Sequence, residues 1–312
     1  MASNTARDAD SDHIVRPPCM IGSAHYRKYP GLCNAGFPQV RAFCIVPSAL
    51  SGGRPSLNRW KFQKPCEDMR LLLYNIRYAV GAGASMHMPL PGAGYILGNQ
   101  SVLPEITAFI RAAKPDIVGL IEVDTGSIRS RRVNQAVKIA TDLGLNTSYE
   151  IKYGAKSINQ LLPIIRKQGN AFLASPNVHG ETFHYFDTGI KRLIIELELE
   201  RFAVFLVHLS LKYRHRHLQL RKLYDLISAT KKPVMVAGDF NTFWGENEIY
   251  LFMRAAGLRS ANTQHLPSYP SRAPRKELDF ILYQEGITVT GFDVPRVRLS
   301  DHLPLICDFE VA

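Results

Sequence analysis

"VMVAGDFNTFWGENEI", residues 234–249, begins with the apolar and small residues typical of a buried strand. Asp239 and Asn241 follow at the end of that run. On an extended chain, residues two apart project to the same side, so this carboxylate and this carboxamide are expected to face one site. The alternative is structural, because a single Asp at a strand end commonly forms a turn or caps a helix.

Three other apolar runs also close with a polar residue. Asn75 ends "LLLYN", Glu122 ends "IVGLIE" and His208 ends "AVFLVH". Burying a polar or charged group without a partner is costly, and functional sites are where such groups commonly occur. Together with Asp239, these residues predict a functional site assembled from four strand ends.

The pattern of the chain from Met69 onward indicates a mixed fold. Residues 70–78 and 116–124 are predicted strands, with amphipathic helices over 102–114 and 134–144. Four further strands follow with no helix between them, as in antiparallel hairpins, at 169–177, 183–187, 191–199 and 201–209.

The remaining segments are a helix over 217–230, a strand over 233–240, a helix over 247–257, and strands over 277–283 and 303–311. Helices and hairpins mixed in this way predict an α/β (α+β) fold, in which two packed β-sheets are flanked by helices.

Composition limits the possible classes of protein. The chain has 312 residues, of which 46% are hydrophobic and 21% charged, as in a soluble globular protein. Its apolar runs are shorter than a membrane span requires, and its polar, acidic N-terminus does not resemble a secretory signal, so we expect a cytoplasmic protein. The formal net charge is +11, with an excess of seven positive charges in residues 69–312, which suits an anionic substrate. The basic stretch at 212–222 is interpreted as a solvated helix face.

Residues 1–68 differ from the rest of the chain. They are rich in Pro, Gly and Ser, and they lack a sustained helix or strand period. We expect a poorly ordered extension, with the catalytic domain over residues 69–312. The alternative is a clip, formed by disulfides or a metal, that uses the four cysteines of this segment: Cys19, Cys33, Cys44 and Cys66.

Six short motifs carry a resemblance to a known family. They are "YN" (74–75), "IE" (121–122), "VHLSL" (207–211), "GDFN" (238–241), "LDFIL" (278–282) and "LSDHLPL" (299–305). Their order is similar to that of the endonuclease/exonuclease/phosphatase superfamily of metal-dependent phosphohydrolases, and the match spans residues 69–312. The resemblance implies a four-layered α/β sandwich with the site at the strand ends where the two sheets meet.

The resemblance also implies roles for the polar residues. Asp239 would orient or deprotonate the attacking water, and Asn241 would contact the phosphate. Glu122 would bind a divalent cation, with Asp301 as a second contributor. Mg²⁺ is the expected ion and Mn²⁺ a possible substitute, since hard cations prefer carboxylate oxygens.

Two histidines complete the implied catalytic group. His302 and Asp279 resemble the family's His–Asp pair, in which the carboxylate fixes the tautomer of the imidazole and supports its charged form. The setting of His208 is similar to that in the deoxyribonuclease I-like and sphingomyelinase-like members, where a second histidine faces the phosphate. Asn75 would bind substrate at the end of the first strand.

Two more residues are implied by weaker motif matches. "GNAFLAS" resembles a family strand that would bring Asn170 toward the site, with a structural turn asparagine as the alternative. "DTGIKRLIIELEL" resembles a segment in which an arginine precedes a strand, so Arg192 would approach an anionic group, with a surface arginine as the alternative.

These observations predict a divalent-metal-dependent phosphoesterase that hydrolyses a phosphodiester, and that acts as a monomer. The substrate class stays open between a nucleic acid and a lipid or sugar phosphodiester, such as a phospholipid, because one metal site can serve many substrates. A non-catalytic binding module with the same fold is the alternative from another class.

Overall fold

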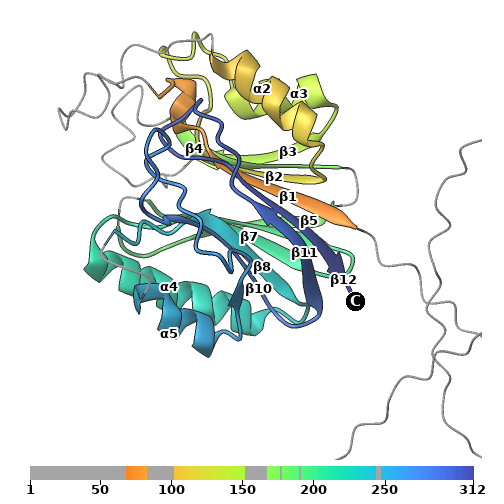
Figure 1. Cartoon of the computed structure of the whole chain (residues 1–312), viewed down its shortest axis with the longest axis vertical. Helices are drawn as coiled ribbons and strands as arrows, with labels where there is room; N and C mark the ends of the chain where they lie inside the picture. Colours follow the sequence, from red (N-terminus) through yellow and green to blue (C-terminus); the bar gives the residue numbers. More distant parts are fainter. Residues whose placement is uncertain (1–67, 83–101, 152–166, 176–177, 190, 244–246) are drawn as a thin grey trace, which may run out of the picture. The chain divides into compact units, whose positions relative to one another are not determined.

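Two six-stranded sheets form the centre of the protein (Figure 1). The computed structural model describes residues 68–82, 102–151, 167–175, 178–189, 191–243 and 247–312. The first sheet has the order β11-β12-β1-β2-β4-β3. Its strands are β1 (Met69–Asn75), β2 (Ile117–Asp124), β3 (Asn146–Ile151), β4 (Gln168–Ala174), β11 (Ile287–Asp293) and β12 (Leu305–Val311).

The second sheet has the order β5-β6-β7-β8-β10-β9. Its strands are β5 (Val178–Tyr185), β6 (Leu193–Leu199), β7 (Ala203–His208), β8 (Val234–Asp239), β9 (Arg259–Ser260) and β10 (Asp279–Tyr283). Only the pairs β1–β2 and β7–β8 are parallel among the paired strands of the described residues; the other pairs are antiparallel.

In the part of the chain that the structure describes, four α-helices cover the outer faces of the sheets (Figure 1). Helices α2 (Val102–Ala113) and α3 (Gln135–Leu143) lie over the first sheet, and α4 (Tyr213–Ala229) and α5 (Asn247–Ala255) over the second. Helix α3 stops where the sequence predicts, because Gly144 adopts a φ of 69°. The four-layered sandwich is therefore confirmed.

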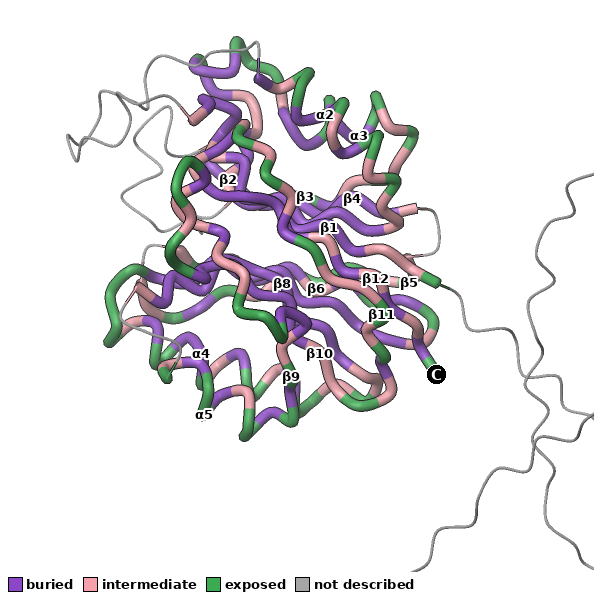
Figure 2. The backbone as a smooth tube through the Cα atoms, in the orientation of Figure 1, coloured by how far each residue is buried: buried purple, intermediate pink, exposed green. Residues whose placement is uncertain are grey.

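Apolar side chains fill three layers of core. One cluster lies between the sheets, and the other two lie between each sheet and its helices. The sheets approach closely at Gly119 of β2, where a Cβ atom would lie 2.9 Å from Leu206 Cδ1 of the opposite sheet. The inner strands of both sheets are accordingly buried along most of their length, whereas β3, β5 and β11 are only partly buried and the helices expose their outward faces (Figure 2).

The first predicted strand ends earlier than expected. Strand β1 stops at Asn75, and a short 3₁₀ helix, η1 (Arg77–Ala79), follows. All three residues of η1 have positive φ angles, of 45°, 57° and 53°. Such angles are uncommon for residues other than glycine, and apolar patterning does not report them. The chain therefore turns sharply just after the first candidate site residue.

Residues 1–67 of the predicted extension, which include its four cysteines, lie outside the described residues, so the cysteine clip stays the alternative to a poorly ordered extension. Cys307, the remaining cysteine, is buried within the core between the sheets. No helix among the described residues is long and apolar enough to cross a membrane.

We expect a chain that begins at Met69 to fold and to unfold cooperatively, because the described core contains no residue before Met69. Thermal unfolding of the full and shortened chains should give similar midpoints. An aggregating shortened chain, or zinc in the full protein that disappears on truncation, would support the cysteine clip instead.

Candidate active site

Strand register brings the predicted polar residues to one edge of the two sheets. Strands β7 and β8 are parallel, and His208 pairs with Asp239 at their carboxyl ends. Strand β10 runs antiparallel to β8, so its first residue, Asp279, lies opposite Asp239. Asn75 ends β1 in the other sheet, and its Nδ2 donates to Asp239 Oδ2 at 3.1 Å. This hydrogen bond joins the two sheets at the site.

Asp239 is the centre of the group, and only 1% of its surface is exposed. His208 Nε2 lies 3.3 Å from Asp239 Oδ2, and the backbone N–H of Asn241 donates to Oδ1 at 3.0 Å. Burial by itself would raise the pKa of Asp239, but the hydrogen bond from His208 and the positive charges of His208, His302 and Lys191 hold that pKa well below its usual range. Asp239 is therefore a carboxylate at neutral pH.

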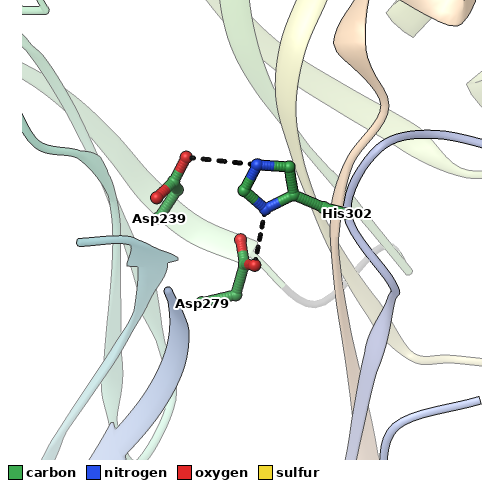
Figure 3. Close-up of side chains that lie close together, drawn as sticks. All are labelled: Asp239, Asp279 and His302. Carbon is green, nitrogen blue, oxygen red and sulfur yellow. Dashed lines mark hydrogen bonds and ion pairs between the residues drawn. The ribbon is translucent and has the colours of Figure 1, made fainter. Parts of the chain in front are cut away.

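His302 and Asp279 form a second, adjacent pair (Figure 3). The Nδ1 atom of His302 lies 2.7 Å from Asp279 Oδ2, which also accepts a hydrogen bond from Ser268 Oγ at 2.6 Å. The Nε2 atom points toward Asp239 Oδ2, 4.0 Å away. Burial lowers the pKa of His302, but the charge and hydrogen bond of Asp279, with the charges of Asp239 and Asp301, outweigh burial and raise it to about 10. The imidazole is therefore protonated and lies between two carboxylates.

This elevated pKa predicts a pH-dependent stability. The pKa of His302 rises from 6.5 to about 10 on folding, so the stabilisation is complete below pH 6.5 and is lost as the pH rises toward 10. We expect the difference in unfolding free energy between the wild type and His302→Ala to shrink over that range. Urea denaturation at a series of pH values measures it. A difference that stays constant from pH 6.5 to 10 would contradict the assignment.

Asn241 departs from the predicted geometry. Its φ of 53° takes the chain out of the extended conformation directly after β8, so Asp239 and Asn241 do not project from one strand face as predicted. The Nδ2 of Asn241 instead donates to Leu209 O at 2.9 Å. Asn241 still lies beside Asp239, through its own backbone N–H.

Asn170 and Glu122 meet across β2 and β4. The β2–β4 ladder shifts register between Leu120 and Val123, and Glu122 lies in this irregularity with a φ of 58°. Asn170 Oδ1 accepts from the backbone N–H of Glu122 at 3.3 Å. Among the described residues, the buried Nδ2 of Asn170 has no hydrogen-bond partner. The sequence predicted Asn170 near the site, and the structure puts it against the candidate metal ligand.

Asp301 lies at the side of the site where β1 ends. Its Oδ2 lies 3.3 Å from Arg77 Nη1, and its Oδ1 accepts from Ser300 Oγ at 3.2 Å. Glu122 and Asp301 are both only partly buried, so water or an ion can reach them. Partly accessible carboxylates beside an otherwise buried polar group suit a hard divalent cation.

Asp239, Asp279 and His302 also have the spacing of a metal site, with ligand atoms within 4.8 Å of one another. Their chemistry fits a cation poorly, because the His302 imidazole is protonated and its Nδ1 faces Asp279. A metal ligand must be deprotonated and must offer a lone pair. Glu122 and Asp301 stay the predicted ligands of the ion, and the three buried residues suit proton transfer.

Arg192 does not lie where the sequence predicts. Its side chain is exposed, and its Nε donates to Gly189 O at 2.8 Å, as in the surface alternative. The preceding residue, Lys191, directs its Nζ into contact with His208 Nε2. Two adjacent cations precede β6, and the sequence did not show which of them faces the site.

Sequence analysis also missed two other residues that touch the site. Arg77 pairs with Asp301, and Ser268 donates to Asp279. Their only signal was proximity to a motif, since Arg77 follows Asn75 by two residues and Ser268 lies in the loop before β10.

Comparison with known proteins confirms the resemblance to a family. Residues 74–302 match the Endonuclease/Exonuclease/phosphatase family, which is more than half of the chain and includes every site residue described above. The chain belongs to this family. The endonuclease/exonuclease/phosphatase family comprises hydrolases that act on phosphate esters.

The match to a curated relative covers only part of each chain. A UPF0294 protein of Yersinia pseudotuberculosis is 38% identical over 94 residues, which are 30% of this chain and 35% of the relative. The chain therefore matches only about a third of the length of that relative.

Two solved structures share the fold. An endonuclease/exonuclease/phosphatase from Beutenbergia cavernae has a TM-score of 0.59 at 19% identity, and covers 78% of this chain and 72% of that one. The human Nocturnin catalytic domain, solved with a bound sulfate anion, has a TM-score of 0.58 at 22% identity. The match covers 78% of this chain and 94% of the Nocturnin domain.

Proposed function

We propose that the protein is a divalent-metal-dependent phosphoesterase that hydrolyses a phosphodiester by in-line attack of an activated water. The observation that carries the proposal is the buried, ionised Asp239 beside a protonated His302. One group can accept a proton and the other can donate one, within a single site. Membership of the family supports the reaction class.

Each residue has a role in this reaction. Asp239 orients the attacking water and takes its proton as the oxygen attacks phosphorus. His302, held by Asp279, donates through Nε2 to a phosphoryl or leaving oxygen as negative charge develops there. His208, Lys191 and the amides of Asn75, Asn170 and Asn241 surround the phosphate. Glu122, with Asp301, would hold Mg²⁺ or Mn²⁺, which neutralises charge on the phosphoryl oxygens.

The low pKa of Asp239 implies that a bound substrate affects the basicity of this carboxylate. A carboxylate with so low a pKa is a weak base, and catalysis favours a pKa near the working pH. An anionic phosphate beside His208, His302 and Lys191 would offset the cations that lower the pKa of Asp239. Substrate binding would thus make Asp239 more basic when the proton must be taken.

A screen of the purified protein tests this function. It would be supplied with Mg²⁺ or Mn²⁺ and tested on plasmid DNA, RNA, sphingomyelin, inositol phosphates and a bis-aryl phosphodiester. We expect hydrolysis of at least one of them, with nicked plasmid identifying a nuclease and released headgroup a lipid phosphodiesterase. No hydrolysis of any substrate with either ion would contradict the proposal and favour the binding module.

A further inference from the structure

Gln219 of α4 is a completely buried amide that makes hydrogen bonds to two segments next to the site. Its Oε1 accepts from the backbone N–H of Ser210 at 2.8 Å. Its Nε2 donates to Lys191 O at 2.7 Å and to Thr188 O at 3.1 Å. Ser210 lies two residues after His208, and Lys191 contacts His208 directly. One side chain therefore holds the backbones that present the Lys191 and His208 side chains.

The segment around Gln219 is shaped to admit this contact. Gly189 has a φ of 90°, and a Cβ atom at that position would lie 2.9 Å from Gln219 Nε2. Glycine permits both the backbone angle and the close approach. A glycine at position 189 thus leaves the space that the Gln219 amide group occupies when it makes these hydrogen bonds.

Helix α4 fixes the segment after β7 with a second buried side chain. Arg216 Nη1 donates to Ser210 O at 2.7 Å and to Leu211 O at 3.0 Å, and its guanidinium pairs with Glu248 of α5. Arg216 does not contact Lys191 through any of these bonds. Gln219 is the residue of α4 whose amide joins the Lys191 backbone to the segment after His208.

We propose that Gln219 is a positioning residue that holds the Lys191 ammonium group against His208, where both bind a phosphoryl oxygen. This inference rests on the proposed function, because the proposed function identifies the phosphate group that Lys191 would bind. Loss of the amide would free the Lys191 backbone and let its side chain leave the site, while the Asp239–His302–Asp279 group stays in place.

A double-mutant cycle tests the proposal on the full chain with Mg²⁺ and the bis-aryl phosphodiester. Gln219→Met, Lys191→Met and the double variant would be compared by kcat, KM and thermal midpoint. We expect Gln219→Met to lower kcat/KM roughly tenfold, chiefly through KM, and to add little in the Lys191→Met background, since coupled residues are not additive. Additive losses would overturn the proposal, as would a Gln219→Met variant with wild-type kcat/KM.

Gln284 offers a matched control. It also bonds two backbone groups, as its Oε1 accepts from Val234 N at 3.0 Å and its Nε2 donates to Ala256 O at 2.9 Å, at the opposite end of β8. Gln284→Met should lower the thermal midpoint without changing kcat/KM. An equal loss of kcat/KM in this variant would show that Gln219 acts only through stability. Gly189→Ala perturbs the same amide from the other side, and provides the test if Gln219→Met does not fold.

Binding of inorganic phosphate separates this inference from the proposed function. Calorimetry should show weaker phosphate binding in Lys191→Met and Gln219→Met and unchanged binding in Gln284→Met, whether or not any ester is hydrolysed. A wild type that binds phosphate in this pattern without hydrolysis overturns the proposed function and retains the role of Gln219. A wild type that does not bind phosphate overturns the role of Gln219.

Discussion

Removal of divalent cations is expected to abolish hydrolysis of phosphate esters by this protein, with a loss on the order of 10³-fold or more. In the proposed reaction His302 and Lys191 supply positive charge beside the phosphate, and Asp239 and Asp279 offset much of it. A phosphodiester is itself anionic and repels an attacking hydroxide. We therefore expect a cation held by Glu122 and Asp301 to neutralise the charge that develops on the phosphoryl oxygens in the proposed reaction.

Glu122→Gln is the matching substitution. It keeps the size of the side chain and removes its charge, so we expect the Mg²⁺ concentration for half-maximal activity to rise by about 100-fold or more, since loss of an outer-shell partner alone costs about 10–100-fold in metal affinity. Calorimetric titration with Mg²⁺ should show the same weakening without substrate. Glu181→Gln, at an exposed position of β5, is the control and should change neither value. Full activity in excess chelator would refute the metal requirement.

Asp239→Asn is expected to lower kcat by about 10²–10⁴-fold, the range for loss of general acid–base help. The substitution keeps the shape of the side chain and an oxygen that can accept the Asn75 hydrogen bond. It removes the charge that accepts the proton of water. Steady-state kinetics at saturating Mg²⁺, with thermal unfolding to verify the fold, measures this loss.

The control for Asp239→Asn is an equally conservative change on the surface. Asp142 pairs with Lys138 on the exposed side of α3, so Asp142→Asn should leave kcat unchanged. If Asp239→Asn folds and retains wild-type turnover, Asp239 is not the base. The proposed division of roles, in which Asp239 accepts a proton and His302 donates one, is then wrong.

Much of the site could be predicted because its residues interrupt apolar runs. Asn75, His208 and Asp239 end strands that are buried along most of their length, and parallel pairing places such ends at one edge. The His302–Asp279 contact joins residues 23 positions apart, and only the resemblance to a family predicted it. Register then explains why Asp279 faces Asp239.

Other features left no periodic signal. Strands β3 and β11 were not predicted, because their burial is partial and β11 contains a bulge between Val289 and Gly291. The positive φ angles at Arg77, Glu122 and Asn241 redirect side chains at the site, and residue type alone does not report them. Residue type likewise does not report that Lys191 contacts His208 whereas Arg192 donates to Gly189 O.

Hydrolysis in ¹⁸O-labelled water tests the central claim most directly. A phosphodiester that the protein cleaves would be incubated with Mg²⁺, and both products would be analysed by mass spectrometry. The proposed attack of an Asp239-activated water on phosphorus predicts label in the phosphoryl product and none in the released alcohol, with incorporation lost in chelator and strongly slowed in Asp239→Asn. Label in the alcohol, or the same rate of incorporation in excess chelator, would contradict the mechanism.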